Sequence, residues 1–98
     1  MYNKAVAKKI EKDAESILTV WARYVNVRYD DSPYRRYKQP YVLTAEHSWG
    51  TAYCDWSWKK NNLIEMLKSN GATKIRAKVK WNFVLIEFDL KKKLQTET

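Results

Sequence analysis

The chain has few of the residues that cross-link small proteins or bind metals. Its 98 residues include one cysteine, Cys54, and one histidine, His47. A single cysteine forms no disulfide within the chain, which is typical of proteins in a reducing compartment, so we expect a cytoplasmic protein. One histidine and one cysteine also supply too few soft ligands for a zinc site. We therefore expect neither a metal nor another cofactor.

Glycine and long apolar runs are scarce as well. Two glycines, Gly50 and Gly71, are too few for a glycine-rich loop that cradles phosphate. No apolar run approaches the about 20 residues of a membrane-spanning helix, and no apolar segment near the N-terminus indicates a signal peptide. The 45% of hydrophobic residues nevertheless suffice for a core. The sequence predicts one domain over residues 1–98, with 91–98 as a frayed basic and polar tail.

The charge balance is the strongest compositional signal. Lysine and arginine number 19 against 11 acids, which gives a formal net charge of +8. Such an excess attracts polyanions over a long range: nucleic acid first, then an acidic protein or an anionic membrane. We expect no membrane binding, because the charged side of the first predicted helix mixes both signs.

Residues 73–90 have the most regular pattern in the chain. Apolar and polar residues alternate on both sides of Trp81-Asn82, which predicts an antiparallel hairpin with one apolar face and one lysine-rich face. The loop can have two or four residues with the same register. The predicted cross-strand pairs are Val79–Val84, Ala77–Ile86, Arg76–Glu87, Ile75–Phe88, Lys74–Asp89 and Thr73–Leu90.

The remaining segments predict an α+β fold. Apolar residues spaced by three and four predict a helix over 2–18 and another over 58–70, which Gly71 ends. Alternation favours a strand over 19–29, although a first helix continuing to about residue 29 is an alternative. Residues 41–48 and 51–57 predict a second hairpin around Trp49-Gly50. The expected order is α-β-β-β-α-β-β, with antiparallel hairpins packed against two helices.

The first five expected elements resemble a double-stranded-RNA-binding domain in their order, and Lys59-Lys60 is similar to the lysine pair at the second helix of that family. The family's signature around this helix start is glycine-rich, whereas the chain reads YCDWSWKKNN. The last hairpin has no counterpart there. We assign the chain to no family.

The sequence predicts no catalysis. His47 and Cys54 fall on the apolar face of the second predicted hairpin, where a thiol is a core residue rather than an activated nucleophile. The acids are scattered, and no pair of them suggests a general acid–base couple or a metal site.

The candidate binding residues form two groups and one separate aromatic. The segment YRRYK, between two prolines, combines guanidinium groups that bind phosphate with rings on which bases stack. Alternate residues of the predicted strand 73–80 place cations about 6.6–7 Å apart along one face. Trp49 sits at a turn tip. The candidates are Tyr34, Arg35, Arg36, Tyr37, Lys38, Trp49, Lys74, Arg76, Lys78 and Lys80.

We therefore expect a small basic nucleic-acid-binding protein that uses phosphate contacts and aromatic stacking on DNA or RNA. The alternative is a protein-binding regulator or inhibitor that docks on an acidic surface of a larger machine, one that can itself handle nucleic acid, because tyrosine, tryptophan and arginine also dominate protein interfaces. Phe83 and Leu85 would be apolar residues on the charged face. The first helix or a second copy of the chain could cover them, and a homodimer could also form at a sheet edge.

Overall fold

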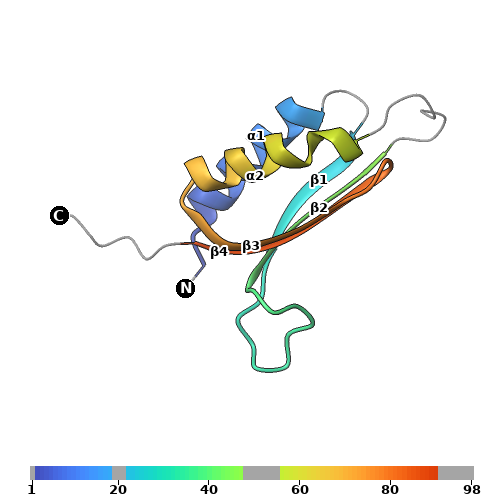
Figure 1. Cartoon of the computed structure of the whole chain (residues 1–98). Helices are drawn as coiled ribbons and strands as arrows, with labels where there is room; N and C mark the ends of the chain where they lie inside the picture. Colours follow the sequence, from blue (N-terminus) through green and yellow to red (C-terminus); the bar gives the residue numbers. More distant parts are fainter. Residues whose placement is uncertain (1, 19–21, 48–55, 91–98) are drawn as a thin grey trace.

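The computed structural model describes residues 2–18, 22–47 and 56–90. They form two α-helices, a short 3₁₀ helix and one four-stranded antiparallel sheet, in the order α-β-β-α-β-β (Figure 1). The elements are α1 (Lys4–Leu18), β1 (Ala22–Tyr29), β2 (Tyr41–His47), η2 (Ser57–Lys59), α2 (Lys60–Ser69), β3 (Ala72–Val79) and β4 (Phe83–Leu90).

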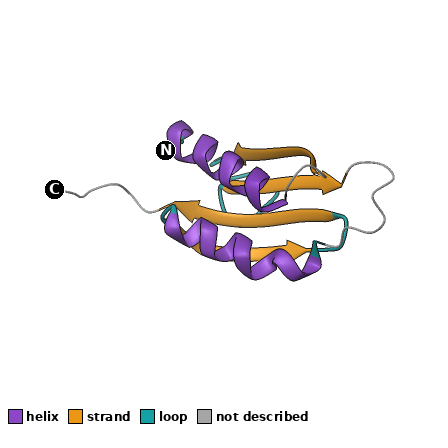
Figure 2. Ribbon diagram, turned by 90° about the horizontal axis from the view of Figure 1, so that it is seen from above, coloured by secondary structure: helices purple, strands orange, loops and turns teal. Residues whose placement is uncertain are grey.

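The chain consists of two αββ halves that meet in the middle of the sheet. The strand order is β1-β2-β4-β3, so each half contributes one edge strand and one central strand. Helix α1 packs against β1, α2 packs against β3, and the helices contact each other. Both helices lie on the same face of the sheet, and the structure places no described helix on the opposite face (Figures 1 and 2). We call that opposite face the open face.

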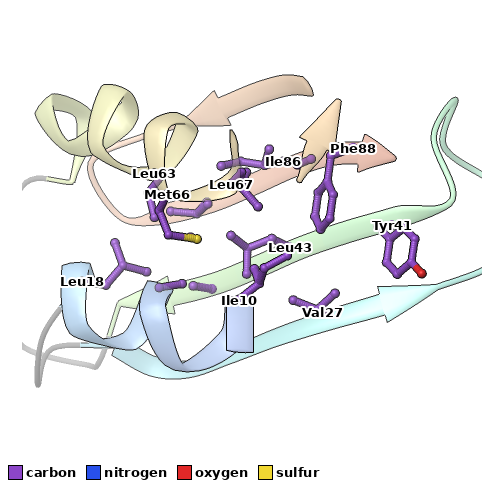
Figure 3. Close-up of a cluster of buried hydrophobic side chains, with 14 of the residues drawn as sticks. Ile10, Leu18, Val27, Tyr41, Leu43, Leu63, Met66, Leu67, Ile86 and Phe88 are labelled. Atoms are coloured by element: carbon purple, nitrogen blue, oxygen red, sulfur yellow. The ribbon is translucent and has the colours of Figure 1, made fainter. Parts of the chain in front are cut away.

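The hydrophobic core lies between the helices and the sheet (Figure 3). Helix α1 buries Ala7, Ile10, Ala14 and Leu18, whose spacing of three and four residues places them on one side of the helix. Alternate residues of each strand complete the core, because successive side chains of a strand point to opposite faces. The largest fully buried side chains are Trp56, Tyr41, Phe88, Ile10, Leu18, Leu43, Leu63, Leu67, Ile86 and Val84.

The predicted α+β class, with antiparallel strands packed on two helices, is confirmed. The strand predicted over 19–29 is also confirmed for Ala22–Tyr29, and the alternative of one helix continuing to residue 29 is wrong. Gly71 ends α2 as predicted, with a φ of +89° that favours glycine.

The second predicted hairpin is wrong. Strand β2 is central, and its two edges pair with β1 and β4 over most of its length. No edge is therefore left for residues 51–57 to pair with residues 41–48. Of the predicted returning strand, Trp56 is buried and leads into η2, while residues 51–55, including Cys54, lie outside the described residues. Trp49 and Gly50 of the predicted turn lie outside them too. The alternation in 41–48 is real, but it says nothing about which strands lie beside it.

The C-terminal hairpin has the predicted register only near its loop. Val79 pairs with Val84, and Arg76 lies opposite Glu87. Beyond Arg76 the register shifts, so that Thr73 lies opposite Asp89 rather than Leu90. Lys74 and Ile75 together face Phe88, which makes a β-bulge, and Lys74 has a φ of +54°. The predicted pairs of Lys74 with Asp89 and of Thr73 with Leu90 are therefore wrong, while Ile75 shares the position opposite Phe88 with Lys74.

Both edges of the sheet carry features that oppose the addition of another strand. On β1, the backbone N–H of Val27 donates to Oε2 of Glu11 at 2.8 Å, so this donor is already used. On β3, the bulge at Lys74 interrupts the regular ladder, and lysines alternate along the strand. Bulges and edge lysines are common means by which natural sheets avoid edge-to-edge pairing.

Lys59 links the two halves below the surface. Its side chain is only 9% exposed, and its Nζ donates to the backbone oxygen of Ile17 at 2.6 Å. This oxygen belongs to the last turn of α1, where carbonyls have no partner within the helix. The ammonium also lies 5.1 Å from the centre of the Trp58 ring. Of the lysine pair that resembles the RNA-binding family, Lys59 is thus a structural residue.

Candidate nucleic-acid interface

The open face of the sheet is built by the strand residues that do not point into the core. Rows of neighbours cross the sheet, because the strands pair in register. One row contains Arg28, Val42, Glu87 and Arg76. The next contains Asn26, Thr44, Leu85 and Lys78, and a third contains Tyr24, Glu46 and Phe83.

This face has a small apolar centre with cations on both sides. Val42 is buried, and Phe83 and Leu85 are half-buried in the middle of the sheet. The side chains of Arg76, Lys78 and Lys80 are exposed on and just beyond β3, and that of Arg28 is exposed on β1. The earlier idea that α1 covers Phe83 and Leu85 is wrong, because α1 packs on the other face.

The loop between β1 and β2, residues 30–40, extends beyond one end of the sheet (Figure 1). Hydrogen bonds from the Arg35 side chain to backbone carbonyls of the same loop hold its conformation. Nε and Nη2 of Arg35 donate to the carbonyl of Lys38, at 3.3 and 2.7 Å, and Nη1 reaches the carbonyl of Ser32 at 3.5 Å. The N–H of Lys38 donates to Oε1 of Glu87 at 2.9 Å, which ties the loop to β4.

A pocket of about 200 Å³ lies between this loop and the sheet. The sheet contributes Arg28 and Val42, which are cross-strand neighbours. The loop contributes Arg35, Arg36 and Tyr37. Three arginines therefore line one cavity, which we call the arginine pocket.

Exposed aromatic rings lie at several places on the molecule. Tyr34 in the loop is 93% exposed, and Tyr24 on the open face is 50% exposed. Trp81, in the hairpin loop between β3 and β4, is 52% exposed, and Trp58 in η2 is 69% exposed. Such rings are available to stack on unpaired bases or to enter a protein partner.

The structure separates the predicted binding residues into different roles. Arg35, Arg36 and Tyr37 come together in the arginine pocket, and Arg76, Lys78 and Lys80 lie with exposed side chains along and just beyond β3. Tyr34 is exposed outside the pocket, and Lys38 anchors the loop through its backbone N–H. Lys74 is part of the bulge. Trp49 lies outside the described residues.

Sequence reasoning missed Arg28, Tyr24 and Trp81. Alternation in β1 does place Arg28 on the polar side of its strand. What it could not indicate is the pairing of Arg28 with Val42, which places both residues beside the loop residues that line the pocket. Pairing between strands depends on the whole fold rather than on the local pattern.

Three acids near this surface hold the loop or its flanking strands, whereas Glu46 lies exposed on the open face beside Tyr24 and Phe83. Besides Glu87, Asp30 accepts the N–H of Ser32 at 2.9 Å, and Asp31 accepts the hydroxyl of Tyr29 at 3.0 Å. Burial, followed by this hydrogen bond, raises the pKa of Tyr29 above its ordinary value. Arg76 and Glu87 lie opposite each other in the sheet, as expected. They form no ion pair, because none of the ion pairs between described residues includes either one.

The ion pairs lie elsewhere in the molecule. Those that join described residues are Lys8–Glu11 and Lys9–Asp13 in α1 and Glu65–Lys68 in α2. Within the described ranges, Arg28, Arg36, Arg76, Lys78 and Lys80 have no carboxylate within ion-pair distance. The helices thus neutralise part of their own charge, although Lys12 and Lys60 on them are also exposed and in no ion pair with a described residue.

Among the described residues, no three histidine, cysteine, aspartate or glutamate side chains cluster as metal ligands would. No described helix is long and apolar enough to cross a membrane. Comparison of the chain with protein-family models, curated proteins and solved structures finds no match.

Proposed function

We propose that the protein binds nucleic acid on the open face of its sheet. The observation that carries this proposal is a set of exposed cations beside a sheet face that no described helix covers. Arg76, Lys78 and Lys80 lie on and just beyond β3, and none of them is in an ion pair with a described residue. Such cations bind phosphates and release the counterions of the polyanion.

Single-stranded nucleic acid suits this surface best. The open face is a sheet with exposed or half-exposed rings, Tyr24 and Phe83, beside a row of cations. Sheets of this kind bind unpaired bases by stacking while cations follow the backbone. A duplex hides the faces of its bases, so it would use the cations only. We propose no catalysis, because the proposed surface contains no activated nucleophile or acid–base pair.

The test compares two double variants that remove the same charge from opposite sides of the molecule. R76A/K78A removes two cations from the open face, and K12A/K60A removes two exposed cations from the helices. Fluorescence anisotropy with a labelled mixed-sequence single strand is measured over a range of salt concentrations. For single strands, each lost phosphate contact lowers the slope of log affinity against log salt by about 0.7. R76A/K78A should therefore lose about 1.4 from this slope, and K12A/K60A should lose little.

Equal losses for both variants would remove the open face from the site, since only the net charge would then matter. A duplex serves as the second ligand, and it should bind more weakly than the single strand.

The half-buried Phe83 and Leu85 favour a second candidate, a regulator that docks on a protein with an acidic surface. Apolar centres with charged rims are typical of protein interfaces. If neither the single strand nor the duplex binds saturably at low salt, nucleic-acid binding is refuted and this second function takes its place.

A further inference from the structure

The arginine pocket has a charge that differs from that of the rest of the open face. Three basic residues, Arg28, Arg35 and Arg36, line it together with one acidic residue, Asp30. The local excess is therefore two positive charges. A phosphate within a nucleic-acid strand carries one negative charge, whereas a terminal phosphate monoester carries about −1.5 to −2 at neutral pH. The pocket matches the terminal group better.

The three arginines have different tasks in such a site. Arg35 already donates three hydrogen bonds to the loop backbone, so it contributes fixed positive charge and holds the pocket in shape. Arg28 and Arg36 are exposed and form no hydrogen bond or ion pair within the described residues. Their planar groups can each donate two parallel hydrogen bonds to phosphate oxygens. Glu87 keeps the loop in place through the N–H of Lys38.

The volume and position of the pocket agree with this ligand. About 200 Å³ holds a phosphate group with several waters, since one water occupies about 30 Å³. Val42 and Tyr37 provide apolar wall for the adjoining sugar or base. Arg28 and Val42 belong to the same cross-strand row as Arg76, so the pocket lies beside the proposed nucleic-acid surface.

We propose that the arginine pocket binds the terminal phosphate of a nucleic-acid strand whose remaining nucleotides lie on the open face. This inference rests on the proposed function and adds a preference for phosphorylated strand ends. It also gives the loop a role distinct from that of the lysines on β3, which contact internal phosphates.

The test uses one short single strand in three forms: with a 5′-phosphate, with a 3′-phosphate, and with hydroxyl groups at both ends. We expect one phosphorylated form to bind about tenfold more tightly than the hydroxyl form at low salt, as hydrogen bonds to charged groups allow. The variants R28A and R36A should lose this preference. The control K78A should weaken all three forms alike and keep the preference. Inorganic phosphate and a nucleoside 5′-monophosphate, added as competitors, should reduce the phosphorylated form to the affinity of the hydroxyl form.

The failures of the two proposals can be told apart. If all three forms bind equally to the unmodified protein, the terminal-phosphate inference is wrong, while nucleic-acid binding stands. If none binds, the proposed function fails as well. A nucleoside monophosphate that binds as tightly as the whole phosphorylated strand would also overturn the inference, because the open face would then contribute nothing.

Discussion

Replacing Lys59 by methionine tests whether a buried ammonium joins the two halves of the fold. Methionine keeps an unbranched side chain that fills similar space, but it cannot donate to the carbonyl of Ile17. The lost hydrogen bond is short, at 2.6 Å, and its donor is charged. Such bonds contribute about 1.5–3 kcal/mol, and a cation at a helix C-terminus adds about 0.3–1 kcal/mol.

The cost of burying the ammonium offsets part of this gain, because the side chain is only 9% exposed. We therefore expect K59M to lower the free energy of unfolding by about 1–2 kcal/mol. For a domain of this size, that corresponds to a decrease in Tm of about 4–15 °C. Thermal and urea unfolding followed by circular dichroism measure both quantities.

The matched control is K60M, since Lys60 is the next residue and is exposed. Substitutions at such surface positions usually change stability by less than about 0.5 kcal/mol. If K59M proves as stable as K60M, the hydrogen bond to α1 contributes nothing net, and the reasoning about Lys59 is refuted.

Two further predictions concern the ion pair Lys9–Asp13 in α1 and the bulge at Lys74. The hydrogen bond from Lys9, followed by that from Asn70, lowers the pKa of Asp13 below its ordinary value of 3.8. The folded state therefore releases this proton more readily than the unfolded state, so the stabilisation is full above that value and is lost as the pH falls through the lower folded pKa. Urea unfolding should accordingly show a stability difference between the unmodified protein and D13N at pH 7 that disappears at strongly acidic pH; a constant difference would contradict this cause. At the bulge, K74G should leave stability unchanged or slightly higher, because glycine adopts a φ of +54° without strain, whereas K78G should lose about 0.5–1 kcal/mol. If urea unfolding shows that K74G and K78G lose the same stability, the positive φ at Lys74 is contradicted.

The helices and most strands could be predicted from local sequence patterns. Spacings of three and four residues identified both helices, and alternation identified Ala22–Tyr29 and the C-terminal hairpin. The bulge at Lys74 escaped prediction because neither a glycine nor an asparagine marks the position of positive φ. The position of β2 between β1 and β4 escaped it because alternation is the same whichever strands lie alongside.

The candidate site was predictable in composition but not in arrangement. The arginines and tyrosines of YRRYK stood out by residue type. Their roles depend on hydrogen bonds that only the folded loop makes, so Arg35 turned out to stabilise the loop and Lys38 to anchor it. Arg28, distant from the loop tip in sequence, joins the pocket through the pairing of β1 with β2.

The division into two αββ halves has a consequence for the order of folding. The hairpins β1–β2 and β3–β4 pair segments that are close in sequence, so closing them costs little chain entropy. The pairing of β2 with β4 joins Tyr41 to Phe88 and must enclose the whole segment between them. Local hairpins form within microseconds, whereas such non-local pairing slows folding. We expect the local hairpins to form first and the pairing of β2 with β4 to form last. Because the core draws on residues of both halves, neither half should be stable until β2 and β4 have paired.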